Sequence, residues 1–351
     1  MKPVARMALE PGMVLGEDVV YQEKILFPAE TVLNAEMIER LKRYSIMCVT
    51  IKEDIDFATT HYEKIRFDDN FKIFQQKHAE NLMRYKHLMK SFISGEKQIS
   101  NEELIAIYND LSSTYDSGTV LLDYLYILVP NEDELTYTHC LNSALLGGTF
   151  ADWMVLEQED KELLILSCFY YDIGKLSLPY DLLWKSAKLS EEEYALVKKH
   201  PVIGYATLNN KSSVDQRIKN AVIMHHERMD GSGYPYHMKG SKIDIFARYV
   251  AIIDTYIAMA SPRSYRTALT PLQILDNFQK NLTVYDMEIL IPLMTRISDA
   301  QIGTTVQLSD DSVWDVFLVH PGRYSLPILK NSEGNTLDLL ENPQLKIVKN
   351  L

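Results

Sequence analysis

Cysteine is scarce in this sequence. The 351 residues include only three cysteines, Cys48, Cys140 and Cys168, which are widely spaced and form no CxxC pair. A secreted disulfide scaffold needs more cysteines, at closer spacing. We therefore predict three reduced, buried thiols in a protein of a reducing compartment.

Long apolar runs are also missing. The two longest, 121–129 and 249–260, contain Asp123 and Asp254, and both fall short of the roughly 20 residues needed to cross a bilayer. The first residues, MKPVARMALEPGM, contain no apolar stretch typical of a signal peptide. We therefore expect no membrane span and a cytoplasmic protein.

Basic residues are outnumbered by acidic ones. Lys and Arg total 36 against 48 Asp and Glu, which gives a net charge of −12. This balance excludes the basic surface of a general DNA- or RNA-binding protein. Apolar residues make up 46% and charged residues 24%, which is typical of a globular protein. At about 150 residues per domain, the length predicts two or three domains.

The spacing of apolar residues predicts a mainly α-helical protein with small β-containing modules at both ends. Residues 1–60 combine short β-type runs with a helix expected at 35–44, which predicts a small mixed α/β module. Apolar residues recur at helical spacing through almost all of residues 121–298, so we expect a multi-helix bundle there. Residues 299–351 alternate apolar and polar positions, and we expect a β-rich module with strands at 305–308, 313–318 and 345–348.

A helical connector is expected at 61–120. Apolar residues recur at helical spacing from 62 to 95 with charged residues between them, which predicts one long polar helix. Its apolar face either packs on its own domain or forms the seam of a homodimer, so a homodimer is expected to use this helix. A new helix is predicted after Ser100, because Ser100 and Glu103 have the spacing of a capping box.

Histidine and aspartate residues in the helical region form a pattern that favours a metal site. Asp254 lies within an apolar helix, and a buried carboxylate has to be paired, protonated or metal-bound. His200 is expected at the end of a helix. Imidazoles and carboxylates without thiolates suit Fe, Mn or Zn. The candidate ligands are His139, Asp172, His200, His225, His226 and Asp254.

The order of these residues resembles that of one bacterial enzyme family. The segment HHERMDGSGYP at 225–235 is similar to the signature of the HD-GYP family, part of the HD phosphohydrolase superfamily. DIGK at 172–175 and SPRSYR at 261–266 support the match, which covers about residues 125–298. The resemblance implies an HD-type multi-helix bundle and a metal-dependent phosphodiesterase that opens cyclic di-GMP to the linear dinucleotide.

Carried over position by position, the resemblance implies one or two divalent ions, with Fe or Mn favoured. The expected ligands of the first ion are three histidines: His200, His225 and His226. Asp172 is expected to bridge to a second ion, which His139 and Asp254 also bind. Asn142 and Glu227 are expected behind the ligands, where they orient the histidines.

Two positions depart from the family pattern. Tyr171 stands where the family has the histidine of its His-Asp doublet, so the second ion is expected to bind weakly or not at all. Leu135 stands where a three-metal variant of the family has a glutamate, so a three-metal centre is not expected. Replacing a neutral imidazole by a phenol with a pKa near 10 removes an easy metal donor.

The expected substrate contacts come from the same resemblance. Lys175, one helical turn after Asp172, is expected to contact a phosphate and to act with Asp172 in catalysis. Tyr234 belongs to the loop that lines the site in the family. Arg263 and Arg266 are expected to reach the other phosphate or the guanine edges, since arginine forks bidentately to both.

Three functions follow from these residues. The first is an enzyme that hydrolyses cyclic di-GMP, weakened by Tyr171. The second is a catalytically degenerate receptor that binds cyclic di-GMP and transmits the signal through the helix at 62–95. The third is a structural scaffold, which should lack the ligands found here. Cyclic di-GMP is the expected partner, and no DNA or RNA polymer is.

Overall fold

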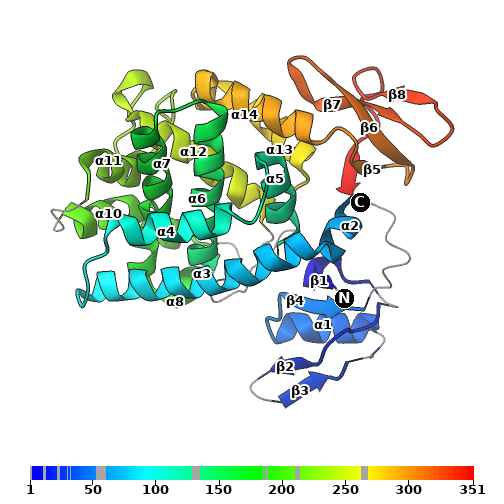
Figure 1. The fold of residues 1–351 in the computed structure, drawn as a ribbon, viewed down its shortest axis with the longest axis horizontal. Coiled ribbons are helices and arrows are strands. Elements are labelled where there is room, and N and C mark those ends of the chain that lie inside the picture. The colour runs from blue at the N-terminus through cyan, green and yellow to red at the C-terminus, as the bar shows by residue number, and fades with distance from the viewer. Residues whose placement is uncertain are drawn as a thin grey trace.

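The structure is a computed structural model, and it describes most of the chain. The described residues are 2–10, 13–21, 24–29, 31, 33–52, 61–128, 135–183, 185, 189–209, 214–261 and 268–351. A large helical body occupies the middle of the sequence, and smaller β-containing parts lie at both ends (Figure 1). This arrangement confirms the predicted mainly α-helical class.

The N-terminal module is a small mixed α/β unit with its own apolar core. Strand β1 pairs antiparallel with β4, so that Val4 lies opposite Val49, and β2 pairs with β3. Helix α1 begins after Asn34, whose side chain accepts a hydrogen bond from the Met37 N–H. Its elements are β1 (Lys2–Ala5), β2 (Val19–Tyr21), β3 (Lys24–Phe27), α1 (Ala35–Arg43) and β4 (Cys48–Ile51).

The long helix predicted at 62–95 is divided in two. Helix α2 (His61–Phe67) ends before Asp68, and α3 (Asp69–Ser94) begins after it. The Asp68 side chain accepts a hydrogen bond from the Asn70 N–H and caps the new helix. The predicted restart at Ser100 is confirmed, because α4 (Asn101–Ser112) begins with a complete capping box between Ser100 and Glu103.

The apolar face of α3 packs inside its own chain. Its large apolar side chains belong to the main core of the helical body: Phe71, Phe74, Leu82, Met89 and Phe92. These residues are therefore occupied by intrachain packing and offer no seam to a second copy. A homodimer stays a prediction that needs another surface of the helix.

The remaining helices build the body that carries the candidate site. Helices α6 and α7 pack against each other, α11 and α12 pack against this pair, and α10 packs against α11. The helices are α5 (Gly118–Ile127), α6 (Leu135–Trp153), α7 (Gln158–Tyr170), α8 (Tyr180–Leu183), α9 (Glu191–Val197), α10 (His200–Asn209), α11 (Gln216–Met224), α12 (Ile245–Ala260), α13 (Pro271–Lys280) and α14 (Met287–Ala300). Short 3-10 turns are η1 (Arg6–Ala8), η4 (Ile173–Ser177), η5 (Gly240–Lys242) and η6 (Leu282–Val284).

The C-terminal part is a five-stranded antiparallel sheet with the order β8-β7-β6-β5-β9. Its strands are β5 (Thr305–Leu308), β6 (Val313–His320), β7 (Arg323–Lys330), β8 (Thr336–Asp338) and β9 (Ile347–Asn350). Val306, Val316 and Leu329 are buried in the same apolar core as the helices. The predicted boundaries at 60, 120 and 298 stay predictions.

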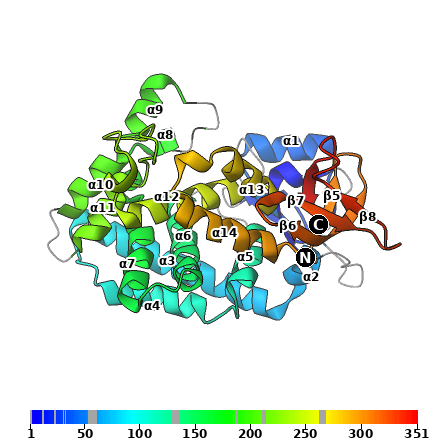
Figure 2. The same ribbon diagram turned by 90° about the horizontal axis from the view of Figure 1, so that it is seen from above.

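Both views place the N-terminal module and the C-terminal sheet at one end of the helical body, away from α10 and α11 (Figures 1 and 2). Helix α2 lies near this junction, where the Tyr62 N–H donates to the carbonyl of Leu351. Within the described ranges, no helix has both the length and the apolar character that a bilayer crossing requires.

Candidate metal centre

The six candidate ligands come from five separate segments and meet at one end of the α6–α7 pair. His139 lies in α6, Asp172 directly follows α7, and Asp254 lies in α12. The histidine doublet follows the last residue of α11. His200 begins helix α10, which corrects the prediction that it ends a helix. Pro201 explains the difference, because proline is favoured in the first turn of a helix and not at its end.

The first group of donors consists of one carboxylate and three imidazoles. Each of the four residues offers an atom within 4.8 Å of an atom of every other, which is close enough for one ion to reach all four. The aspartate and the first two histidines are completely buried, and the third histidine is partly buried. The group is Asp172, His200, His225 and His226.

Two of these imidazoles are oriented by the backbone. His200 Nδ1 lies 2.7 Å from the carbonyl of Val197, and His225 Nδ1 lies 2.8 Å from the carbonyl of Val222. With both Nδ1–H groups donating, the Nε2 lone pairs face each other at 3.2 Å. Such lone pairs repel unless a proton or a cation lies between them, and a backbone contact at the other ring nitrogen is typical of metal-binding histidines.

An orphaned oxygen adds to the fit of a metal ion. Asp172 Oδ1 is buried and has no hydrogen-bond partner among the described residues. It lies 3.2 Å from His200 Nε2 and 3.7 Å from His225 Nε2, so it points at the same space as the two lone pairs. A buried acceptor without a donor costs free energy. A divalent cation on these atoms would remove that cost.

The second group of donors contains Asp172 again, with His139 and Asp254. His139 Nε2 lies 2.8 Å from Asp254 Oδ1, and both side chains are buried. His139 Nδ1 is buried without a hydrogen-bond partner among the described residues. Asp172 belongs to both groups, so its carboxylate could serve as a ligand in each.

Tyr171 lies beside both groups, but its hydroxyl has another partner. The ring is completely buried, with its centroid 5.0 Å from the ring of His225 and 5.9 Å from the ring of His139. The hydroxyl lies 3.1 Å from Ser143 Oγ in α6. Burial and the nearby carboxylates raise the pKa of Tyr171 well above its ordinary value, so the phenol is neutral in the metal-free chain.

The charges of the site favour deprotonated ligands. Burial opposes ionisation of Asp172, but the Lys175 ammonium and the imidazoles beside it hold the pKa of this carboxyl well below its usual range. The pKa of Asp254 is also lowered, against its burial, by the contact with His139. Burial lowers the pKa of His200 and, more strongly, that of His226. The carboxylates are therefore charged and these imidazoles neutral, as metal binding requires.

Two glycines let the segments approach closely enough to form the site. A Cβ on Gly174 would lie 2.0 Å from the carbonyl oxygen of His200, so only glycine allows η4 to meet α10 here. A Cβ on Gly233 would lie 2.3 Å from the carbonyl oxygen of His226. The absence of a side chain at Gly233 therefore lets the loop fold back onto the doublet. The ring of Tyr234 then stacks on His226 with centroids 4.6 Å apart.

A cavity of about 150 Å³ opens beside the second group. Its lining includes His139, Asp172 and Lys175, together with Leu135 at the beginning of α6. Lys175 Nζ lies 2.6 Å from Asp172 Oδ2. The cavity has room for a phosphate-sized group next to the shared carboxylate and the Lys175 ammonium. Arg263 and Arg266 lie outside the described residues.

The two residues predicted to orient the histidines have other partners. Asn142 Oδ1 lies 2.7 Å from Nε2 of His78, which belongs to α3. The Glu227 carboxylate accepts hydrogen bonds from the backbone N–H groups of Tyr236 and Met238 and so holds the glycine-rich loop in place. Sequence reasoning missed Ser143 and His78, because nothing near either residue in the sequence marks it as a partner of a site residue.

The chain is similar in sequence to several known proteins. Residues 131–289 match a family model described as HD domain. The chain is 35% identical over 126 residues to the cyclic di-GMP phosphodiesterase response regulator RpfG of Xanthomonas campestris, which covers 36% of this chain and 33% of that protein. It is 33% identical over 152 residues to the 3'3'-cGAMP-specific phosphodiesterase 1 of Vibrio cholerae, which covers 42% of this chain and 34% of that protein.

A solved structure is also similar. It is Bd1817, described as an HDG"Y"P protein from Bdellovibrio bacteriovorus, with a TM-score of 0.47 and 16% identity over 83% of this chain and 97% of that one. The chain spans about a third of the length of the two curated relatives named above, at 33% and 34%.

Proposed function

We propose that the chain is a metal-dependent phosphodiesterase of the HD-GYP type that hydrolyses cyclic di-GMP to the linear dinucleotide. Its match to an HD domain model over residues 131–289 supports this proposal. One observation carries the proposal: six buried or partly buried donors form two groups that share Asp172. The names of the relatives support the substrate class, since both act on cyclic dinucleotides.

The chain's donors fit one or two divalent ions, and we propose Fe or Mn. The group with three imidazoles is the proposed tight site, and the group with His139 and Asp254 is the weaker one. Imidazole and carboxylate donors suit these ions, and no cysteine belongs to either group. When bound, such ions polarise a phosphoryl oxygen and activate the attacking water.

The remaining residues are proposed to bind and orient the substrate. Lys175 lines the cavity beside the shared carboxylate, where its ammonium is positioned to stabilise negative charge on a phosphoryl oxygen. We propose that Tyr234, whose ring stacks on His226, also contacts the substrate. We propose that Arg263 and Arg266 contact the second phosphate or a guanine of the dinucleotide.

Turnover by the purified full-length chain tests the proposal. The chain is incubated with cyclic di-GMP in the presence of Mn²⁺ or Fe²⁺, and the linear product is separated by chromatography. We expect linear dinucleotide with the wild type and none with Asp172→Asn. Parallel reactions with 3'3'-cGAMP identify the preferred dinucleotide. Binding of cyclic di-GMP without turnover under both ions would contradict the enzyme and indicate the degenerate receptor.

A further inference from the structure

A second and larger cavity lies away from the metal centre. It has a volume of about 470 Å³ and is lined by residues of α4, the beginning of α5, the end of α6 and the beginning of α7. None of the candidate metal ligands lines it. Its size falls in the range of about 300–1,000 Å³ typical of small-molecule sites.

Aromatic side chains form the walls of this cavity, and glycines make room for two of them. Tyr108 of α4 lies against Gly148, where a Cβ would be 2.3 Å from the Tyr108 hydroxyl oxygen. Trp153 lies against Gly118, where a Cβ would be 2.4 Å from the indole ring. Any larger residue at either glycine would displace the ring. The aromatic walls therefore depend on close backbone approach.

The charges that line the cavity are mostly negative. Asp116, Asp152 and Glu162 contribute three carboxylates, against the single ammonium of Lys161 among the described residues. Lys161 Nζ lies 2.5 Å from Asp152 Oδ1 and 6.0 Å from the centre of the Tyr108 ring. The cavity thus already holds one ammonium between a carboxylate and an aromatic face. This ammonium is covalently tethered, and two further carboxylates remain on the walls.

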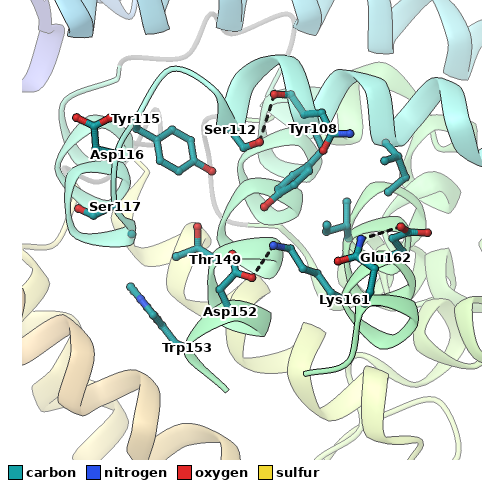
Figure 3. A pocket seen from close by; sticks show the side chains of 15 residues that line it. Tyr108, Ser112, Tyr115, Asp116, Ser117, Thr149, Asp152, Trp153, Lys161 and Glu162 are labelled. Atoms are coloured by element: carbon teal, nitrogen blue, oxygen red, sulfur yellow. Dashed lines mark hydrogen bonds and ion pairs between the residues drawn. The ribbon is translucent and has the colours of Figure 1, made fainter. Parts of the chain in front are cut away.

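Polar groups lie at the middle of the cavity. Figure 3 shows the hydroxyl ends of Tyr108 and Tyr115 directed toward the interior, with Lys161 reaching across to Asp152. The Tyr115 hydroxyl is buried and has no hydrogen-bond partner of good geometry within the described ranges, although Thr149 lies close by. Phenol oxygens accept hydrogen bonds from an ammonium group as readily as from a neutral donor.

We propose that this cavity binds a small organic cation of the class of protonated aliphatic amines. Aromatic faces attract a desolvated cation, and carboxylates at the edge of the cavity attract its charge and accept its N–H groups. An anionic ligand is disfavoured, because the one lining ammonium is paired with Asp152. The proposal does not depend on the reaction at the metal centre.

Calorimetric titration of the full-length chain with putrescine tests the ligand class. Putrescine has two ammonium groups on a four-carbon chain, and butanediol is its neutral isostere. We expect saturable binding of putrescine to one site and no binding of butanediol. Equal binding of the two compounds, or no saturable heat with putrescine up to millimolar concentrations, would overturn the proposal.

Two variants with opposite expected effects locate the binding in the cavity. Asp152→Asn should weaken putrescine binding by about three- to tenfold, because it removes a carboxylate and leaves Lys161 uncompensated. Lys161→Met should tighten binding by a similar factor, since it removes the internal competitor while keeping the aliphatic bulk. A gain of affinity cannot come from misfolding.

A charge-matched control separates the cavity from the acidic surface of the whole chain. Glu157 directly precedes α7, is exposed, makes no side-chain cap and does not line the cavity. Glu157→Gln should leave the affinity within about twofold of the wild type, as expected for a solvent-screened charge. Equal affinity in all three variants and the wild type would place putrescine elsewhere and overturn the proposal.

Discussion

The two donor groups of the metal centre share a carboxylate but differ in how complete they are. The first combines Asp172 with three imidazoles, of which two are oriented by backbone carbonyls. The second has one imidazole and two carboxylates, and the hydroxyl of the neighbouring Tyr171 lies 3.1 Å from Ser143 Oγ. The first group therefore offers four donor residues and the second offers three.

The comparison also shows that packing and ligation are separable here. The Tyr171 ring is completely buried and meets the edge of His225, so it fills the space between the two groups. A buried aromatic side chain contributes to core packing whether or not its polar end binds a metal. The Tyr171 ring therefore contributes to the packing of the site, while its hydroxyl contacts Ser143.

The largest expected effect comes from the residue that both groups share. Asp172→Asn removes a charge from both positions, and we expect turnover to fall by roughly a thousandfold or more, since Asp172 would hold both of the proposed ions. Asp123→Asn is the matched control, because Asp123 is also buried and pairs with a histidine, His61, outside the site. Equal losses in turnover would contradict the shared role of Asp172.

The next effect separates the two groups. His225→Ala should abolish tight metal binding, whereas His139→Ala should leave the ion of the first group in place. Metal content per chain, measured by elemental analysis after dialysis, distinguishes the two variants. An equal loss of metal in His139→Ala and His225→Ala would contradict the expected difference in affinity between the two donor groups.

Replacing Tyr171 by histidine tests whether an added imidazole completes the second donor group. In Tyr171→His we expect a second ion to bind and turnover to rise by at least the roughly 10- to 100-fold that changes in the outer-shell partners of a metal ligand cause. Tyr171→Phe is the control, because it removes only the hydroxyl and its contact with Ser143, a loss of about 1 kcal/mol in the free energy of unfolding. A rise in turnover in the phenylalanine variant would show that the hydroxyl obstructs the site.

The smallest effect is a pH dependence of stability in the metal-free chain. The pKa of His226 is well below its ordinary value of 6.5, mainly through burial. Below about pH 6.5 the unfolded chain therefore binds a proton that the folded chain does not, and the free energy of unfolding falls as the pH drops toward the folded-state pKa.

Urea unfolding at several pH values between about 8 and 5 measures this slope. We expect His226→Gln to reduce this slope and the same substitution at His87, which is exposed in α3, to leave it unchanged. A metal-free chain that becomes more stable as the pH falls through this range would contradict the burial of a neutral imidazole.

Local signals in the sequence predicted much of the helical frame. The capping box at Ser100 and Glu103 and the buried position of Asp254 follow from residues within one or two turns of each other, and both are confirmed. The break at Asp68 was missed, because apolar spacing continues across it. Strand β7 was missed as well, since Pro327 lies inside it and proline is unusual within a strand.

Contacts between residues that are far apart in the sequence could not be predicted from local sequence patterns. Only the family resemblance indicated that His139, Asp172 and Asp254 would form one donor group. The contact between Tyr171 and Ser143 joins residues on two different helices, and the cavity near Trp153 depends on Gly118 and Gly148. Such contacts depend on how helices pack, which residue spacing within one helix does not determine.

Titration of the metal-free chain with Mn²⁺ in a calorimeter tests the central asymmetry most directly. We predict one tight site, formed by the group with three imidazoles, and a second site that is much weaker or undetectable. Two equally tight sites, or no tight site at all, would contradict it.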